Sequence, residues 1–413
     1  MLAQKIVRFI IYFLLIFTPL ARASVQGWAV CIIHIMTLIG LTVFFVDRAL
    51  RWDWKWIRTP LDMPILAIIC LSTASTIFST HQYTSIQSIL LQLNYIAVFY
   101  LVIHTIGTRS QFRQIVYVIL GVGTFLSVFG LIKQSGFNPF PWWEYTNIGQ
   151  NIRRLSATYG NPDHLAGYME MAIPVGLGFL ITGIKEGKRV LLVFAVLLMV
   201  TALIFSMSRG GWIGLLLGLF FMAIILIQSQ YFKYKKITAG LILCFLVIAL
   251  VIISSTDVVM RAKTFEQGED VVDNRVTVWK GILDMIPDYA LLGSGPGTFA
   301  FVFTQYQPPG LRAHFTMAHN DFLHFLSELG FAFIIIAVWI ILMFYWKGLK
   351  KMQKKSRLVR GVTLGSMSGI TAMLIHSAGD FNLHIPANAL LFSCIAALTL
   401  LPSFNNKQMR MYK

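Results

Sequence analysis

The chain has 413 residues, of which 57% are hydrophobic and 12% are charged, and its formal net charge at pH 7 is +17. This composition excludes a water-soluble globule, which would expose apolar surface on every side, so lipid is the expected solvent for most of the chain. Backbone groups in hydrocarbon need internal hydrogen-bond partners, and repeated apolar runs of about 17 to 25 residues therefore predict helices rather than a barrel. We predict an all-α polytopic membrane protein with a single transmembrane domain over residues 1–413.

About twelve transmembrane helices follow one another along the chain. The first apolar run has Lys5 and Arg8 before it and ends at Ala21-Arg22-Ala23, so a cleaved signal peptide is the alternative for this segment. The cysteines fall in apolar runs without paired spacing, which predicts neither a disulfide framework nor a zinc site. The predicted spans are 6–21, 27–46, 62–79, 88–107, 114–132, 166–184, 190–206, 211–229, 237–255, 321–346, 361–377 and 386–402.

The positive charges alternate between the connections and predict the orientation of the spans. Of the 34 Lys and Arg residues, 24 fall in the segments that are cytoplasmic if the chain starts inside. Both termini are then cytoplasmic, and the alternate loops face the periplasm from a bacterial inner membrane. Topology and anionic lipid explain the basic loops without nucleic acid. The sequence lacks a Walker motif, so no nucleotide is expected.

Two external loops are long, one near 133–165 and the other near 256–320. Both are rich in aromatic residues and proline, so we expect them to fold against the outer face of the membrane. The second loop contains a predicted interfacial helix near 273–286 that Pro287 ends. Its expected N-cap is Asp273 or Asn274, and its expected apolar positions are Val276, Trp279, Leu283 and Ile286.

Two external arginines are candidate anion-binding residues. An unpaired Arg209 at the membrane surface would be costly, although a contact with lipid phosphate also explains it. Arg275 lies on the interfacial helix, where Asp273 or Glu269 is an alternative partner. Together the two guanidinium groups form a plausible clamp for a diphosphate, because each can bind phosphate oxygens in a bidentate manner.

His319 lies where the second external loop re-enters the membrane, and it is a candidate general base because histidine exchanges a proton near neutral pH. A capping or interfacial histidine is the alternative. On an unbroken helix from His319, Glu328 would face the opposite side. Asp321, His324 and Glu328 would share a face, so Glu328 is predicted to be a structural group rather than the direct partner of the base.

His376, Asp380 and His384 recur at four-residue spacing and would form one polar stripe on a continuous helix. A metal site is one interpretation of this stripe. Gly379 and Pro386 interrupt the segment, however, and the sequence offers no evident fourth ligand, so we favour a polar cavity lining and predict no metal.

These residues resemble the bacterial O-antigen ligase and O-antigen polymerase superfamily of integral-membrane type-C glycosyltransferases. One departure is Asn161-Pro162-Asp163, where the family commonly has Asn-Pro-Asn. The resemblance starts near Arg154, and the residues that carry it are Thr158 to Tyr168, Ser208-Arg209-Gly210, Asn274-Arg275, Trp279, Gly293 to Phe299, His319-Asn320, Leu323, Glu328 and Gly330.

The resemblance implies transfer of a glycan from undecaprenyl diphosphate to an acceptor hydroxyl, without metal, nucleotide or other cofactor. It implies that Arg209 and Arg275 hold the diphosphate and that His319 activates the acceptor. Lipid A-core is the preferred acceptor, which makes the chain a ligase; a polysaccharide polymerase and a protein O-oligosaccharyltransferase are alternatives within the family. A transporter of the lipid-linked glycan is a more distant alternative, since transporters place polar sites near the bilayer midplane and often contain inverted repeats. Possible supporting residues are Arg154, Asn320, Glu328, His376 and Asp380.

Overall fold

The computed structural model describes residues 2–140, 154–230, 240, 271–311, 314–354 and 356–402, with only the backbone of 271–274. The regular elements in these residues are helices, and they contain no strand, so the predicted all-α class is confirmed. The α-helices are α1 (Leu2–Leu20), α2 (Gly27–Arg51), α3 (Asp62–Ile77), α4 (Gln82–Thr105), α5 (Arg109–Gln134), α6 (Pro162–Leu180), α7 (Glu186–Phe205), α8 (Arg209–Gln228), α11 (Val271–Met285), α12 (Phe299–Val302), α13 (Asp321–Leu329), α14 (Ala332–Met352), α15 (Arg357–His376) and α16 (Pro386–Leu400).

Eight helices in the described part of the chain are long and apolar enough to cross a membrane, which supports a multi-pass membrane protein. Two further apolar helices, α3 and α16, are shorter, with 16 and 15 residues. Apart from residue 240, the predicted span 237–255 lies outside the described residues. The eight candidate spans are α1, α2, α4, α5, α7, α8, α14 and α15.

Polar side chains at the helix starts explain several boundaries. Asn161 and Ser208 cap α6 and α8 by accepting backbone hydrogen bonds from the first turn. Pro162 follows as the first residue of α6, a position that needs no N–H donor. Thr108 and Gln111 form a reciprocal capping box at the start of α5. These helices therefore begin where local sequence signals satisfy their free N–H groups.

The predicted continuous span 321–346 is wrong, because the chain breaks at Gly330 into the short helix α13 and the long helix α14. Gly330 has a φ of +71°, which side-chain-bearing residues rarely adopt. A Cβ at this position would lie 2.5 Å from the carbonyl oxygen of Leu291. Close approach of the segment around Leu291 thus requires glycine and ends α13 after nine residues.

The helix predicted near 273–286 exists, but its start and its buried face differ from the prediction. It begins at Val271, so neither Asp273 nor Asn274 is its cap. Its buried positions include Val278 and Ile282, which pack with apolar residues that follow α11 in the chain, such as Phe299 and Phe303. Val276 and Leu283, which were predicted to face the apolar side of this helix, are instead 40% and 58% exposed.

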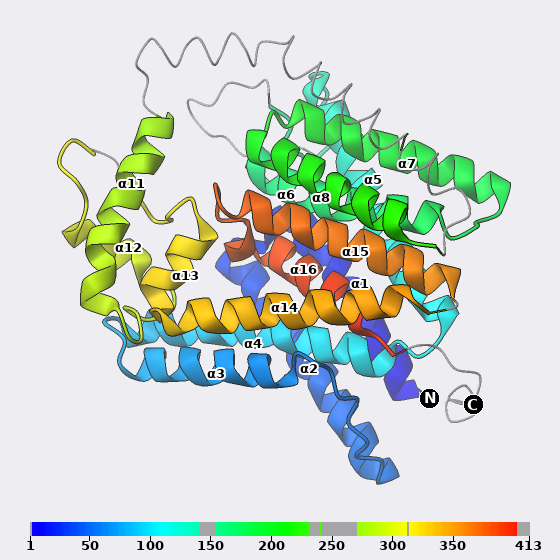
Figure 1. Cartoon of the computed structure of the whole chain (residues 1–413), viewed down its shortest axis with the longest axis horizontal. Helices are drawn as coiled ribbons and strands as arrows, with labels where there is room; N and C mark the ends of the chain where they lie inside the picture. The colour runs from blue at the N-terminus through cyan, green and yellow to red at the C-terminus, as the bar shows by residue number, and fades with distance from the viewer. Residues whose placement is uncertain are drawn as a thin grey trace.

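In Figure 1, α3, α4, α14 and α15 run side by side, and α11, α12 and α13 gather at one end of them. The helix α15 packs most extensively against α6 and α8, and it also contacts α14 and α16. Glycines allow this close packing: a Cβ at Gly365 would overlap the carbonyl of Pro174, and one at Gly218 would lie 2.6 Å from the carbonyl of Ser368. The centre of the bundle is therefore α6, α8 and α15.

The α11–α13 end of the bundle is also where the predicted external connections meet. The hydroxyl of Thr158, before α6, donates to the carbonyl of Pro19 in α1 at 2.7 Å. The backbone of Thr80, between α3 and α4, donates to Ser294 at 3.0 Å. The backbone of Leu155 donates to Phe205, at the end of α7, at 2.9 Å. These contacts fit the alternating topology inferred from the charges.

Candidate active site

The turn 377–380, which follows α15, joins two of the predicted site segments. Its backbone carbonyls accept hydrogen bonds from α11 and from the start of α13, which are far apart from it in sequence. The pairs are Asp321 N to Ser377 O (2.8 Å), Asn320 Nδ2 to Ala378 O (3.0 Å), Arg275 Nη1 to Gly379 O (2.8 Å) and Asp321 N to Asp380 O (3.1 Å). The structure therefore brings Arg275 and Asn320 to one turn.

His319 lies beside this turn, with its Nδ1 atom 3.4 Å from Oδ1 of Asp380. The histidine side chain is 29% exposed and the aspartate 4%. The φ of His319 is +49°, a left-handed value immediately before Asn320, the N-cap of α13. Uncommon backbone conformations of this kind often occur at functional sites. His319 therefore precedes the helix instead of extending it, and its ring also lies edge-on against Phe381, 4.9 Å between centroids.

A hydrogen bond from His319 and positive charge nearby keep Asp380 ionised. Burial alone would raise the pKa of Asp380, but its contacts with His319 and His376 outweigh that effect and hold this pKa well below its usual value. Arg275 contributes in the same direction. Asp380 is thus a charged carboxylate that can orient the His319 ring.

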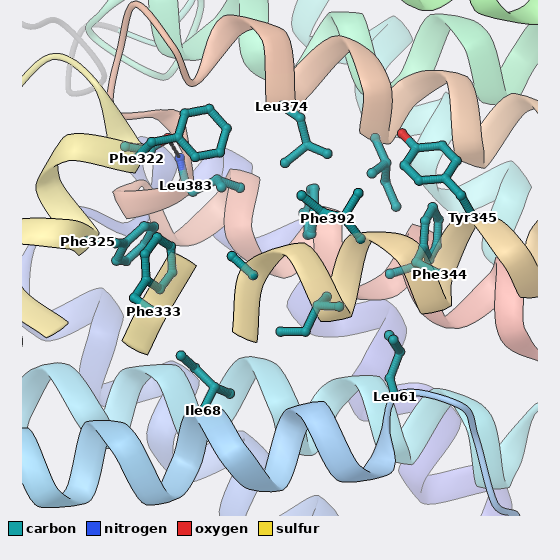
Figure 2. Close-up of a pocket in the computed structure, with 16 residues that line it drawn as sticks. Leu61, Ile68, Phe322, Phe325, Phe333, Phe344, Tyr345, Leu374, Leu383 and Phe392 are labelled. Carbon is teal, nitrogen blue, oxygen red and sulfur yellow. Dashed lines mark hydrogen bonds between the residues drawn. The ribbon is translucent and has the colours of Figure 1, made fainter. Parts of the chain in front are cut away.

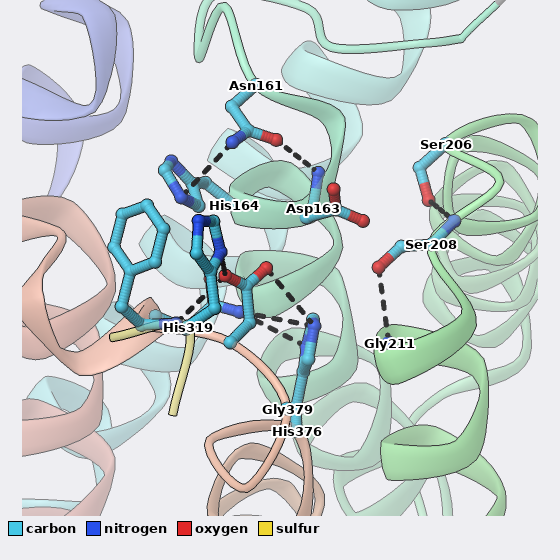
Figure 3. Close-up of polar contacts among 12 residues, drawn as sticks. Asn161, Asp163, His164, Ser206, Ser208, Gly211, His319, His376 and Gly379 are labelled. Carbon is cyan, nitrogen blue, oxygen red and sulfur yellow. Dashed lines mark hydrogen bonds and ion pairs between the residues drawn. The ribbon is translucent and has the colours of Figure 1, made fainter. Parts of the chain in front are cut away.

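Beneath Asp380, a buried histidine and glutamate continue the polar contacts. Nε2 of His376 lies 3.9 Å from Oδ2 of Asp380. Its Nδ1 lies 3.1 Å from Oε1 of Glu170, which is in α6 and 0% exposed. Figure 3 shows His319, Gly379 and His376 gathered at this turn, opposite the start of α8.

Arg209 is the first residue of α8 and is exposed. The next residue, Gly210, packs directly against the ring of His376, where a Cβ would overlap the ring atoms. The start of α8 is therefore in contact with the polar chain that leads to His319. Arg209, Arg275 and His319 are carried by three segments that meet at the His376 end of α15.

Arg154 connects the starts of α6 and α8. Its Nη2 atom lies 2.7 Å from Oδ1 of Asp163, and its Nε donates to the carbonyl of Ser206 at 2.8 Å. Asp163 is the residue where the sequence departs from the family pattern, and here it supplies a charge for Arg154. Arg154 is therefore a structural link beside the site, which shapes the segment that leads to Arg209.

A second polar cluster contains Asp321, His324 and His384. Because His384 belongs to this cluster, the predicted single stripe of His376, Asp380 and His384 is wrong. The helix α15 ends at His376, and the chain then turns, so His384 does not lie on the same helix as His376. Nδ1 of His384 lies 2.6 Å from Oδ1 of Asp321. The ring of His384 packs against that of His324 at 4.1 Å.

Glu328 completes this second cluster and holds the glycine-rich loop after η3 (Ile286–Tyr289). Its carboxylate lies 3.1 Å from Nε2 of His324 and accepts backbone hydrogen bonds from Gly297 (2.8 Å) and Phe299 (3.0 Å). Asp321, His324 and Glu328 do share a face of α13, as predicted. The contacts of Glu328 are thus structural.

His324, Glu328 and His384 offer three ligand atoms within 4.8 Å of one another, the arrangement among the described residues that comes nearest to a metal site. Hydrogen bonds already occupy most of these atoms. The backbone N–H of Ala318 donates to Nδ1 of His324 at 3.4 Å, which leaves Nε2 to donate to Glu328. Among the ring nitrogens and carboxylate oxygens of these three residues, Nε2 of His384 is then the one atom without a hydrogen-bond partner in the described part of the chain. One free ligand atom is fewer than the three or four protein ligands that a zinc site uses.

An apolar pocket adjoins the second cluster, between α3 and the helices α14, α15 and α16 (Figure 2). Its walls include Phe322, Phe325, Phe333 and Phe392. Asp321 also borders it, two residues from His319. A chain of hydrocarbon character could therefore lie close to the polar site.

The sequence singled out His319, Arg275 and Asp380, which the structure places at one turn, but it did not single out Glu170. An acidic residue inside an apolar run was the available signal, since ionisable groups in such runs are rare and usually paired. His164 was also missed; it lies near the site, with its ring 4.8 Å from that of Phe381. Asn161, which caps α6, lies 3.3 Å from His164.

Comparison with known families adds one match. A family model described as O-antigen ligase matches residues 194–338, a range that includes Arg209, Arg275 and His319. The turn 377–380 and Glu170 lie outside the matched range. No curated protein matches the chain.

Proposed function

We propose that the chain is a glycosyltransferase of the O-antigen ligase superfamily, which the match over residues 194–338 supports, and that it transfers a glycan from undecaprenyl diphosphate to lipid A-core. The observation that carries this proposal is the turn 377–380, where Asp380 contacts His319 and the Gly379 carbonyl binds Arg275. A candidate base and a candidate diphosphate ligand therefore share one rigid support.

In the proposed reaction the acceptor hydroxyl attacks the anomeric carbon of the donor sugar. Because Nδ1 of His319 faces Asp380, its Nε2 is the nitrogen that takes the hydroxyl proton. The new C–O bond forms as the bond from the anomeric carbon to the phosphate oxygen breaks, and the electron pair leaves with undecaprenyl diphosphate. Arg209 and Arg275 offset the negative charge on this leaving group. The reaction balances without nucleotide, oxidant or metal.

The apolar pocket beside Asp321 supports a lipid-linked donor. Its phenylalanine walls suit a polyprenyl chain, which would enter from lipid and gain van der Waals contacts with the rings. A donor lying there would have its diphosphate near the polar residues of the candidate site.

The proposal also assigns the site to the periplasmic face of the bacterial inner membrane, with both termini in the cytoplasm. We expect alkaline phosphatase fused after Gln134 to be active, because that position is predicted to be external, and the same reporter fused after Lys185 to be inactive. The opposite pattern would place the site in the cytoplasm and contradict the proposal.

The direct test uses purified protein in liposomes with an undecaprenyl-diphosphate-linked glycan, lipid A-core and a chelator. The readout is glycan on the acceptor. We expect transfer by the wild type and none by His319→Ala or by His319→Asn. Asparagine tolerates a positive φ, so His319→Asn removes the base with little backbone strain and controls for misfolding.

Other outcomes separate the alternatives. Transfer only to a second lipid-linked glycan would identify a polymerase, and transfer only to a protein hydroxyl would identify an oligosaccharyltransferase. Movement of the donor across the bilayer without transfer to any acceptor would identify a transporter and refute the enzyme proposal. Loss of transfer on adding the chelator would refute metal independence.

A further inference from the structure

Glu170 and His376 form a buried pair that the proposed reaction does not itself use. Both side chains are almost fully buried, 0% and 2% exposed, and they lie 3.1 Å apart on α6 and α15. Leaving one member of such a buried charged pair without its partner strongly destabilises a protein. Ionisable side chains inside membrane helices are rare and usually functional, so this pair needs an explanation beyond packing.

Two glycines on α8 make the space for this pair. A Cβ at Gly210 would overlap the His376 ring, and a Cβ at Gly214, one turn later, would lie 2.7 Å from Oε2 of Glu170. The first turns of α8 therefore lie directly on the pair. Because α8 begins with Arg209, the pair supports the helix start that carries a candidate diphosphate ligand.

The same pair also supports the base. His376 presents Nδ1 to Glu170 and directs Nε2 towards Asp380, 3.9 Å away, and Asp380 in turn contacts His319. Asn382 adds a contact of its side-chain amide with the His376 ring at 3.2 Å. A continuous line of contacts thus runs from the buried centre of the bundle to the exposed edge of His319.

We propose that Glu170 and His376 are positioning residues that fix Asp380 against His319 and fix the start of α8 beneath Arg209. This inference rests on the proposed function. Neither residue touches substrate in it, and Glu170→Gln keeps the side-chain volume that packs against Gly214 of α8, so Arg209 stays in place. Removing the charge of Glu170 should therefore slow turnover and leave donor binding nearly unchanged.

The kinetic test compares Glu170→Gln, which keeps shape and one acceptor oxygen, with Met171→Leu, a buried volume-conserving control on the same helix. A general base contributes about 10²- to 10⁴-fold, so loosening its support should lower kcat by about 10- to 100-fold. We expect the KM for the lipid donor to change less than about threefold, because the ground-state contacts remain. Met171→Leu should behave as the wild type.

A double variant tests the route through Asp380. If Glu170 acts through Asp380, Glu170→Gln combined with Asp380→Asn should be no slower than Asp380→Asn alone. Additive losses would show that Glu170 acts elsewhere, and a wild-type kcat in Glu170→Gln would overturn the inference. Should Glu170→Gln fail to fold, His376→Asn removes the other member of the pair and must give the same kinetic pattern.

A third measurement needs no glycan. Diethyl pyrocarbonate modifies accessible histidines, and mass spectrometry can follow His319 with the exposed His314 as the internal reference. We expect Glu170→Gln to change the rate at His319 severalfold relative to His314, because the contact with Asp380 loosens. An unchanged rate would overturn the positioning role. A changed rate with no glycan transfer by the wild type would reject the proposed function and keep the inference.

Discussion

Glu328 offers a test of the distinction between structural and reacting groups at this site. Its carboxylate is 3% exposed, accepts two backbone hydrogen bonds from Gly297 and Phe299, and contacts His324. In Glu328→Gln the amide keeps one acceptor oxygen but turns an N–H₂ donor towards a buried donor. Loss of a hydrogen bond to a charged group costs about 1.5–3 kcal/mol, and a buried donor left without a partner costs about 1–3 kcal/mol. We therefore expect a loss of about 2–4 kcal/mol in unfolding free energy, after partial relaxation.

The assay is thermal unfolding of the purified protein in detergent, read beside the glycan-transfer rate of the fraction that remains folded. Glu186→Gln is the matched control, since Glu186 is exposed in the first turn of α7. We expect Glu328→Gln to unfold at a distinctly lower temperature and to retain turnover when folded. A variant with unchanged unfolding but abolished turnover would refute the structural assignment and make Glu328 part of the reaction.

Three further perturbations follow from single contacts. Gly214→Ala should destabilise the protein by about 1–3 kcal/mol, because the added methyl group overpacks the contact with Glu170. The control is Gly121→Ala on α5, where the space is open, and this variant should be neutral or stabilising. Equal unfolding temperatures of the two variants would contradict this prediction. Arg154→Ala should raise the donor KM and lower stability by about 1 kcal/mol, and unchanged kinetics and unfolding would exclude its linking role. Burial lowers the pKa of His384, but the hydrogen bond to Asp321 outweighs this and raises it above 6.5. The contribution of this contact to the free energy of unfolding should be complete below pH 6.5 and lost as the pH rises through the raised pKa of His384. If the unfolding temperature of the wild type does not change between pH 6 and 9, as expected for His384→Gln, the prediction is wrong.

The sequence predicted the fold well where a type of residue is compatible with few structures. Long apolar runs predicted the spans because lipid allows few alternatives to a helix. The charges of the connections predicted an alternation that the contacts at the α11–α13 end fit. The site was less accessible to this reasoning. Arg275 and His319 lie in one predicted loop, yet the residues that join them are the backbone carbonyls of 377–380, and carbonyls carry no side-chain signature.

The errors have a common cause in packing between distant segments. The break at Gly330 depends on Leu291, and the corrected buried face of α11 depends on residues that follow it in the same loop, so neither could be read from local periodicity. Glu170 is the most instructive omission. A single acidic residue in an apolar run was visible, but its partner is 206 positions away in the chain. Such a residue is expensive unless paired, and the cost itself predicts that a partner exists. Searching the other spans for a histidine near their predicted external ends would have paired Glu170 with His376, a residue that the polar stripe had already singled out.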